Sequence, residues 1–203
     1  MILDVPFFKQ EQKNDCGPSA LQMVLDYLGE YYPKEKLMDL VDSDRSGVTF
    51  TLGLARAVAE LGFKTEFYSA NLGINPENYN LEFYKKETEG ISLNQEKLNK
   101  LISESKKLGV KIEERKLSLE ELLSKLSEDC IPIILLDWSL INETENFIGH
   151  FVPIVGYDEE NVYVHNQGLK DFRPFLPIKR KLFDQARTAK GTDEDVLFVY
   201  RRY

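Results

Sequence analysis

A cysteine stands where a helix is predicted to begin near the N-terminus. In the stretch KQEQKNDCGPSALQMVL, which starts at Lys9, Cys16 precedes a Gly-Pro step. Proline is tolerated at the first helical position because its missing N–H would have no partner there, and apolar residues at helical spacing follow Pro18. A helix N-terminus favours an anion, so we expect the pKa of the Cys16 thiol to lie below the ordinary value of about 8.5. The alternative is a small buried residue in a turn, because free cysteine is among the most buried residue types.

Two histidines, His150 and His165, are available as a base for such a thiol. In the run VYVHN, the alternation of a strand places Asn166 on the side of Val162 and Val164, and His165 on the opposite side. If the valines face the core, Asn166 points inward and His165 outward. We therefore expect Asn166 to lie beside His150 on a neighbouring strand. A thiol, an imidazole and an orienting amide are the parts of a nucleophilic cysteine site.

The residues around this constellation have candidate roles of their own. Gln10, six residues before Cys16, is a candidate donor to an oxyanion beside the Cys16 backbone N–H; Gln12 competes for that role, and a solvated loop residue is the alternative. A histidine at a strand start is commonly a structural hydrogen-bonding residue, and an asparagine before Gln-Gly can begin a turn. Cys130 lies in a buried run without a nearby base, so we assign it to packing. Residues beside the candidate nucleophile and base are expected to contact the substrate: Asp15, Gly17 and Gly149.

Composition bounds the class of protein. The 203 residues suit one domain over 1–203, and 42% hydrophobic with 30% charged residues is typical of a soluble globule. The net charge of −8, without a dense Lys/Arg block, argues against a nucleic-acid partner. The longest apolar run, IPIILLDW, is too short to span a bilayer, and the N-terminus does not resemble a signal peptide; we expect no membrane partner and a cytoplasmic location. Two cysteines exclude a disulfide framework and, with two distant histidines, do not readily form a zinc site. We expect neither a metal nor another cofactor.

The first part of the chain is predicted to be mostly helical. One helix follows Cys16, a short one follows Pro33, and a third runs from about Thr51 to a stop at Gly62. The alternation in FKTEFYS, residues 63–69, then predicts a strand with one solvated face.

Residues 71–109 are expected to form an insertion or lid followed by a helix. Residues 71–90 are rich in asparagine and aromatic residues without a clean period, so we expect an ordered loop that packs on the body or covers the site. Capping-box patterns at Ser92 and Ser118 predict the starts of two later helices, of which the first stops at Gly109. If the loop is a lid, at least one of three side chains should lie within reach of the cleft: Tyr79, Phe83 or Tyr84.

The second part of the chain is predicted to be mostly strands, with a helix around 181–189. The runs IPIILLD, HFVPIVGY, NVYVHN and DVLFVY are the predicted strands. Helices first and an antiparallel sheet later predict an α+β fold, in which a helical half that carries Cys16 at a helix start packs on a C-terminal antiparallel sheet.

QEQKNDCGPSALQMVL together with GHFVPIVGYD resembles the papain-like, double-glycine leader peptidase superfamily, cysteine peptidase family thirty-nine. In that superfamily a Gln six residues before the Cys, the Cys, a His and an Asp or Asn form the site. A closer resemblance, to the guanylyl cyclase domain-containing family of eukaryotes, covers nearly the whole chain and is carried by NLGINPENYNLEFYKKETE, GHFVPIVGYD and QARTAKGTDEDVLFVY. It implies a papain-like fold with Cys16, His150 and Asn166 at the triad positions and Gln10 at the oxyanion position. The family often has a proline soon after the third triad residue, where this chain has Gln167.

These patterns lead to three functional hypotheses. The leading one is a papain-like thiol enzyme that transfers an acyl group from a peptide or small amide, with peptidase, amidase and transferase left open. The second is a non-catalytic interaction module that keeps the fold. The leader peptidases proper are fused to transmembrane transporters, so we do not carry over a role in bacteriocin maturation.

The third hypothesis, guanylyl cyclase, is implied by the family's name. That reaction usually takes metal-binding carboxylates and a cationic clamp on the triphosphate. The sequence has no Gly-rich phosphate loop, and its acidic balance opposes a polyanionic substrate. GTDED, from Gly191, could bind a metal, but a charged turn before a strand is the simpler interpretation. We therefore rank the cyclase below the thiol enzyme.

Overall fold

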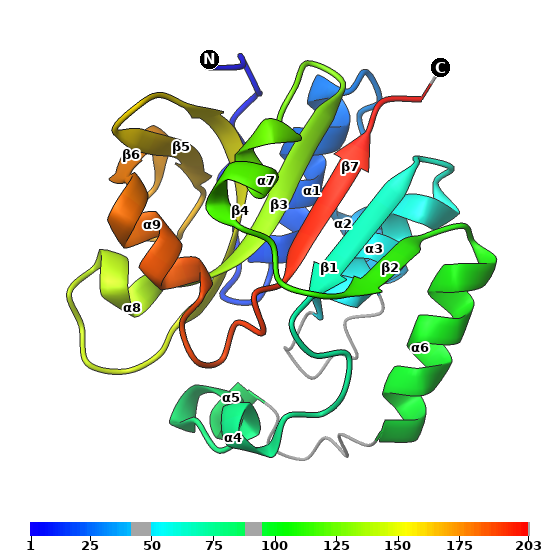
Figure 1. Ribbon diagram of the computed structural model, residues 1–203. Helices are drawn as coiled ribbons and strands as arrows, with labels where there is room; N and C mark the ends of the chain where they lie inside the picture. Colours follow the sequence, from blue (N-terminus) through cyan, green and yellow to red (C-terminus); the bar gives the residue numbers. More distant parts are fainter. Residues whose placement is uncertain (42–49, 88–94, 203) are drawn as a thin grey trace.

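The computed structural model describes residues 1–41, 50–87 and 95–202. In these ranges seven strands form one sheet in the order β2-β1-β7-β3-β4-β5-β6 (Figure 1). The strands are β1 (Thr65–Ser69), β2 (Lys111–Glu114), β3 (Cys130–Asp137), β4 (Gly149–Tyr157), β5 (Asn161–Asn166), β6 (Arg173–Lys179) and β7 (Val196–Tyr200). β1 and β2 pair in parallel and the other neighbouring strands pair antiparallel. The predicted α+β class with a mostly antiparallel sheet is confirmed.

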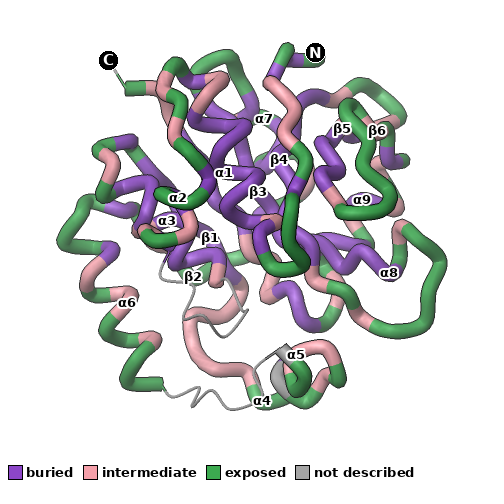
Figure 2. Tube along the Cα trace, turned by 180° about the vertical axis from the view of Figure 1, so that it is seen from behind, coloured by how far each residue is buried: buried purple, intermediate pink, exposed green. Residues whose placement is uncertain are grey.

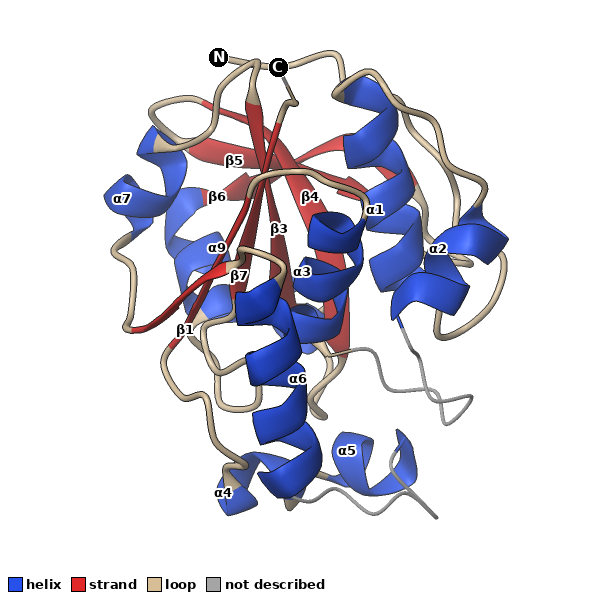
Figure 3. Cartoon of the chain, turned by 90° about the vertical axis from the view of Figure 1, so that its right-hand side faces the viewer, coloured by secondary structure: helices blue, strands red, loops and turns tan. Residues whose placement is uncertain are grey.

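Helices cover both faces of this sheet. Figure 3 shows α1, α2 and α3 on one face and α7 and α9 on the other. The helices are α1 (Cys16–Tyr27), α2 (Lys34–Val41), α3 (Thr51–Glu60), α4 (Pro76–Tyr79), α5 (Glu82–Glu87), α6 (Gln95–Lys107), α7 (Leu119–Ser124), α8 (Trp138–Ile141) and α9 (Arg180–Arg187). None of the helices in the described ranges is long and apolar enough to cross a bilayer.

The helix that begins at Cys16 is deeply buried. From Gly17 to Leu25 every residue of α1 is buried, because β4 lies on one side and α2 and α3 lie on the other (Figure 2). A helix that is covered all round has little freedom to shift. α1 therefore holds its first residue, Cys16, in a fixed place against the sheet.

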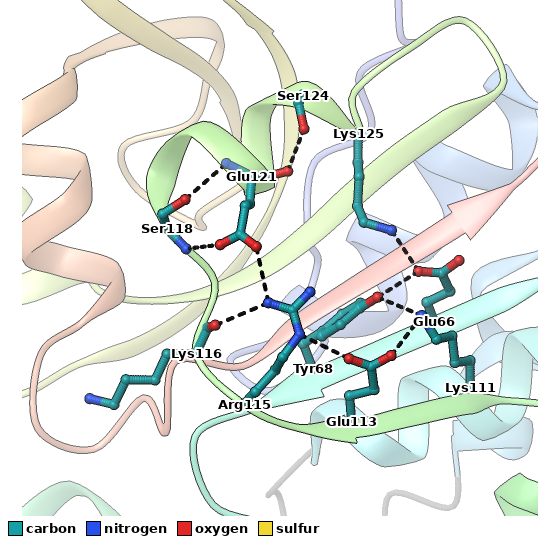
Figure 4. Close-up of polar contacts among 10 residues, drawn as sticks. All are labelled: Glu66, Tyr68, Lys111, Glu113, Arg115, Lys116, Ser118, Glu121, Ser124 and Lys125. Atoms are coloured by element: carbon teal, nitrogen blue, oxygen red, sulfur yellow. Dashed lines mark hydrogen bonds and ion pairs between the residues drawn. The ribbon is translucent and has the colours of Figure 1, made fainter.

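The predicted solvated face of the first strand is wrong. All five residues of β1 are buried. α3 packs on one face of the strand, and the other face carries Glu66 and Tyr68 under a layer of charged side chains (Figure 4). Lys125 Nζ lies 2.7 Å from Glu66 Oε2, and Tyr68 OH donates to the same oxygen at 2.9 Å. Glu66 can be buried here because its carboxylate is paired and hydrogen-bonded.

Two strands were not predicted. β2 and β6 are the edge strands of the sheet. β2 is only four residues long and largely exposed, and β6 contains Pro174 and Pro177, which interrupt a strand pattern and are tolerated mainly at sheet edges. The sheet therefore extends beyond the C-terminal half, because β1 and β2 join it across β7.

Local signals for helix ends agree with the structure where it is described. Ser118 and Glu121 form the predicted capping box at α7, and α6 ends just before Gly109, which has a positive φ of 85°. The other capping box, at Ser92, lies outside the described residues. Within the expected loop at 71–90, the structure forms the two short helices α4 and α5.

Candidate active site

Cys16 is the first residue of α1, and the loop before it is held by Asp15. The buried Asp15 Oδ2 accepts hydrogen bonds from the backbone N–H groups of Glu11 and Gln12 at 3.0 and 3.2 Å. Lys34 Nζ, from the start of α2, lies 3.1 Å from the same oxygen. Asp15 thus fixes the loop that leads into the helix, and it does not line the cavity beside Cys16.

Gln10 stands at the other end of that loop. It is buried, its Nε2 donates to the backbone oxygen of Gln12 at 3.0 Å, and its backbone N–H donates to the oxygen of Gln167 at 2.9 Å. The same nitrogen also donates, over a longer 3.5 Å, to the backbone oxygen of Lys13. Gln10 lines the cavity, so a group that enters it would compete with Lys13 for this second hydrogen.

His150 and Asn166 meet on the adjacent strands β4 and β5, as predicted. Both are buried, and His150 Nε2 lies 3.1 Å from Asn166 Oδ1. Asn166 Nδ2 donates to the backbone oxygen of Asp171, which identifies Oδ1 as the atom that faces the imidazole. Nε2 of His150 must then carry a proton and Nδ1 must be the acceptor. The ring of Trp138 packs edge-on against the imidazole with a centroid distance of 4.8 Å.

A cavity of about 300 Å³ joins these parts. Cys16, His150, Asn166 and Gln10 all line it, although they come from three separate regions of the chain. Gly149, which precedes the histidine, also lines it, whereas the other two residues expected to contact substrate, Asp15 and Gly17, do not.

Burial shifts the two central pKa values in opposite directions. Burial raises the pKa of the Cys16 thiol. The backbone N–H groups of Phe151 and Gly17 favour the thiolate and lower this pKa, but by less than burial raises it. The expected lowering by the helix N-terminus is therefore wrong for this site, because desolvation outweighs it. Burial also lowers the pKa of His150 to about 4, although the hydrogen bond to Asn166 acts in the opposite direction and raises this pKa. At neutral pH both groups in this cavity are therefore neutral, the thiol as well as the imidazole.

The prediction that His165 points outward is wrong, because His165 is fully buried. Its Nε2 bonds the backbone oxygen of Val5 at 2.8 Å, and its Nδ1 accepts from the backbone N–H of Phe175 at 3.0 Å. The ring lies between Phe7 and Phe175. The N-terminal segment and β6 cover the face that the alternation assigned to solvent, so His165 has a structural environment.

Gln167 is a central residue of the site for which we predicted no role. Its buried Nε2 donates to the backbone oxygen of Cys16 at 2.9 Å and to that of Phe151. Its own backbone oxygen accepts from Gln10. One residue thus links the helix start, the strand that carries His150 and the loop that carries Gln10. The signal for this role was the glutamine itself, at the place where the related family often has proline.

Two residues of the expected lid reach the cavity. Phe83 and Tyr84 from α5 line it together with Cys16; the side chain of Tyr79 lies outside the described part of the structure. Among the described residues, no group of three or more His, Cys, Asp or Glu side chains is placed to hold a metal ion.

Solved structures with the same fold include several peptidases. The peptidase domain of Streptococcus ComA, a bifunctional ABC transporter involved in quorum sensing, superposes with a TM-score of 0.55 at 14% identity, over 98% of this chain and 99% of that domain. A C39-like peptidase from Bacillus anthracis superposes with a TM-score of 0.57 at 19% identity, over 99% of this chain and 97% of that chain. A double-glycine motif protease from an AMS/PCAT transporter, solved in complex with the leader peptide, superposes with a TM-score of 0.54 at 18% identity, over 98% of this chain and 94% of that chain. At these identities the likeness shows a shared papain-like fold.

Sequence comparison leads to a second group of proteins. Guanylyl cyclase 1 from Arabidopsis thaliana is 28% identical over 213 aligned residues, which cover 97% of this chain and 76% of that protein. The family model described as "Guanylylate cyclase" matches residues 5–199, nearly the whole chain. The chain therefore belongs to the guanylylate cyclase family, whose member described here has the fold of the C39-like double-glycine peptidases.

Proposed function

We propose that this protein is a papain-like thiol enzyme that transfers an acyl group from a peptide or small amide. The observation that carries the proposal is the hydrogen bond between His150 Nε2 and Asn166 Oδ1, in the cavity that Cys16 also lines. That bond leaves Nδ1 of the imidazole as a proton acceptor within the cavity. A base with a fixed tautomer and a thiol at a helix start, both facing one cavity, are the groups that nucleophilic cysteine catalysis uses.

The reaction starts from the neutral pair. As a substrate carbonyl enters, His150 Nδ1 takes the proton of Cys16 Sγ, and the sulfur attacks the carbonyl carbon. The oxygen that becomes negative is held by the Cys16 backbone N–H and by Gln10 Nε2. When the C–N bond breaks, the imidazolium returns its proton to the leaving amine, and a thioester remains on Cys16. Water or a second amine then gives its proton to His150, attacks the thioester and releases the acyl group, which regenerates the thiol.

The raised pKa of Cys16 and the lowered pKa of His150 suit this order of events. Proton transfer is coupled to attack rather than completed in the resting enzyme, because burial disfavours both charges. The backbone N–H groups of Phe151 and Gly17 favour the thiolate once it forms. The ring of Trp138 covers one side of the imidazole.

Alkylation by iodoacetamide, followed by intact mass and peptide mapping, tests the proposal. We expect Cys16 to react at neutral pH and His150→Ala to slow the reaction by roughly a hundredfold or more, within the 10²–10⁴-fold range of general-base effects. Asn142→Ala is the matched control, because Asn142 lines the same cavity and is expected to leave the rate unchanged. An unreactive Cys16 in the folded protein, or equal rates with and without His150, would favour the non-catalytic interaction module instead.

Guanylyl cyclase activity is the second candidate, favoured by the match to Guanylyl cyclase 1 over 97% of the chain. Incubation with GTP and Mg²⁺ or Mn²⁺, with cyclic GMP measured by mass spectrometry, tests it directly. If the protein is a thiol enzyme only, we expect no cyclic GMP to form. Production that persists in Cys16→Ser would establish the cyclase and separate it from the cavity chemistry.

A further inference from the structure

The helices α4 and α5 form a cap, residues 76–87, that is fastened to the turn before β7. Tyr84 OH donates to the backbone oxygen of Gly191 at 2.6 Å, and Asn78 Nδ2 donates to Asp193 Oδ1. Figure 1 shows the cap directly below this turn, more than a hundred residues away in sequence (107 for the Tyr84 bond). The GTDED turn, which begins at Gly191, thus acts as an anchor for the cap.

The anchor is closely fitted at Gly191. A Cβ placed there would lie 2.7 Å from Leu81 Cδ1 and 2.8 Å from Phe147 Cε2, closer than side chains approach one another. Only a glycine lets the turn, the cap and the loop before β4 meet at this point, and its φ of 104° is also one that glycine adopts readily.

Three aromatic rings form a wall between the cap and the site. Phe83 packs edge-on against Phe147 at 5.4 Å, and Tyr84 stacks on Phe147 at 5.5 Å. The wall lies on Gly149, where a Cβ would be 3.3 Å from the Phe83 ring and 3.4 Å from the Phe147 ring. Gly149 immediately precedes His150, so the wall covers the backbone next to the base.

The rest of the cavity rim is polar and exposed. Lys13 and Asn14 line it from the loop before α1, and Lys170 and Asp171 line it from the loop after β5. These two loops lie together, because the Gln10 backbone N–H bonds the Gln167 oxygen. The cavity therefore has one side closed by aromatic rings and another open to solvent, and its 300 Å³ is at the lower end of the range for small-molecule sites.

We propose that the aromatic wall restricts the substrate to a small amide or to the end of a peptide chain. This inference rests on the proposed function and names its substrate class. One side of the scissile amide meets Phe83 and Tyr84, which line the cavity and are backed by Phe147. Only a short apolar group fits there, and the remainder of the substrate leaves across the polar rim. The interior of a long polypeptide would need an exit through the wall.

Three electrophiles test this selection on the intact protein. They are iodoacetamide, a peptide with a terminal vinyl sulfone, and a peptide of equal length that carries the same group at its centre. With iodoacetamide the sulfur displaces iodide, and the thiol proton is lost to solvent. With the two vinyl sulfones the thiol adds to the alkene, so that a C–S bond forms and the sulfur proton ends on the adjacent carbon. We expect Cys16 to react with the first two, and with the central probe slower by about tenfold or more, the discrimination that bulk against an apolar pocket produces.

Gly191→Ala should open the wall and bring the rates of the two peptide probes close to each other. Gly109→Ala is its matched control, because Gly109 also has a positive φ, of 85°, but nothing lies within 4 Å of its added Cβ. If Gly191→Ala does not fold, Tyr84→Phe removes the hydroxyl that bonds Gly191, keeps the ring, and should narrow the difference between the two peptide probes in the same direction. Equal rates for both peptide probes on the wild-type protein would overturn this inference alone. A Cys16 that reacts with none of the three electrophiles would overturn the proposed function together with it.

Discussion

Replacement of Gln167 by leucine tests how the three parts of the site are held together. Gln167 Nε2 supplies hydrogen bonds to two backbone oxygens, those of Cys16 and Phe151, in the interior. Leucine is of similar size but cannot donate. A buried polar group that loses its partner costs about 1–3 kcal/mol. Gln167 Oε1 itself has no partner, so its removal returns part of that cost, and we expect the free energy of unfolding to fall by about 1–3 kcal/mol in total.

The same substitution should affect the chemistry of the thiol. Gln167 joins the carbonyl of Cys16 to that of Phe151, the residue after His150. Without this link, the packing of α1 on β4 remains, but hydrogen bonds no longer align the start of α1 with the start of β4. A displacement of about 1 Å between reacting groups can cost on the order of a hundredfold in rate. We expect iodoacetamide to alkylate Cys16 in the folded variant roughly ten- to a hundredfold more slowly than in the wild type.

Gln22→Leu is the matched control. Gln22 is also buried and also donates from Nε2 to a backbone oxygen, that of Tyr32 at 3.2 Å, but it does not line the cavity. Urea denaturation gives the stability of both variants, and alkylation below the unfolding transition gives the rates. Gln22→Leu should lose stability and keep the wild-type rate. A folded Gln167→Leu variant with the wild-type rate, or equal slowing in both variants, would refute the positioning role.

Other consequences of burial can be measured in the same way. The pKa of His150 is lowered to about 4, so its contribution to stability is present above about pH 6.5 and is lost as the pH falls through 4. His150→Gln should flatten the stability profile between these two pH values. An unchanged slope in the variant would contradict the assignment to His150. Burial raises the pKa of Asp195 to about 7, so its contribution to stability is present below about pH 4 and is lost as the pH rises through 7. Asp195→Asn should remove this loss of stability. If the stability of the variant still falls over the same pH range, another group causes the fall. Ser118→Ala should lower the free energy of unfolding by about 1 kcal/mol because the capping box at α7 is lost, and a melting temperature equal to the wild type would contradict this. His165→Ala should destabilise the protein in urea more than Asn142→Ala, because it empties a buried position and removes two hydrogen bonds; equal midpoints would show that the His165 site collapses without cost.

The sequence alone determined the features that depend on near neighbours along the chain. Pro18 places Cys16 at a helix start, and Ser118 with Glu121 begins α7. The alternation in β5 puts Asn166 opposite His150. These signals are local, because a cap or a strand face depends on residues only two to four positions apart. The family resemblance, which the match over residues 5–199 confirms, added the fold that joins these elements.

Only the tertiary structure decided how far each group is buried. The helix start alone favours a thiolate at Cys16, but desolvation of the thiol in the folded protein raises its pKa instead. The predicted outward face of His165 is covered by the N-terminal segment and β6, and the predicted solvated face of β1 is covered by paired charges. Burial depends on segments distant in sequence, which hydrophobic periodicity does not report.

The contacts that shape the cavity are also long-range. Gln167 reaches Cys16 across 151 residues, and Tyr84 reaches Gly191 across 107. Nothing in the spacing around either residue indicates its partner, because each bond forms only after the sheet has brought the two segments together. Residue types and local spacing therefore determined which groups can do the chemistry. The packing of distant segments decided their protonation, their alignment and the space left for a substrate.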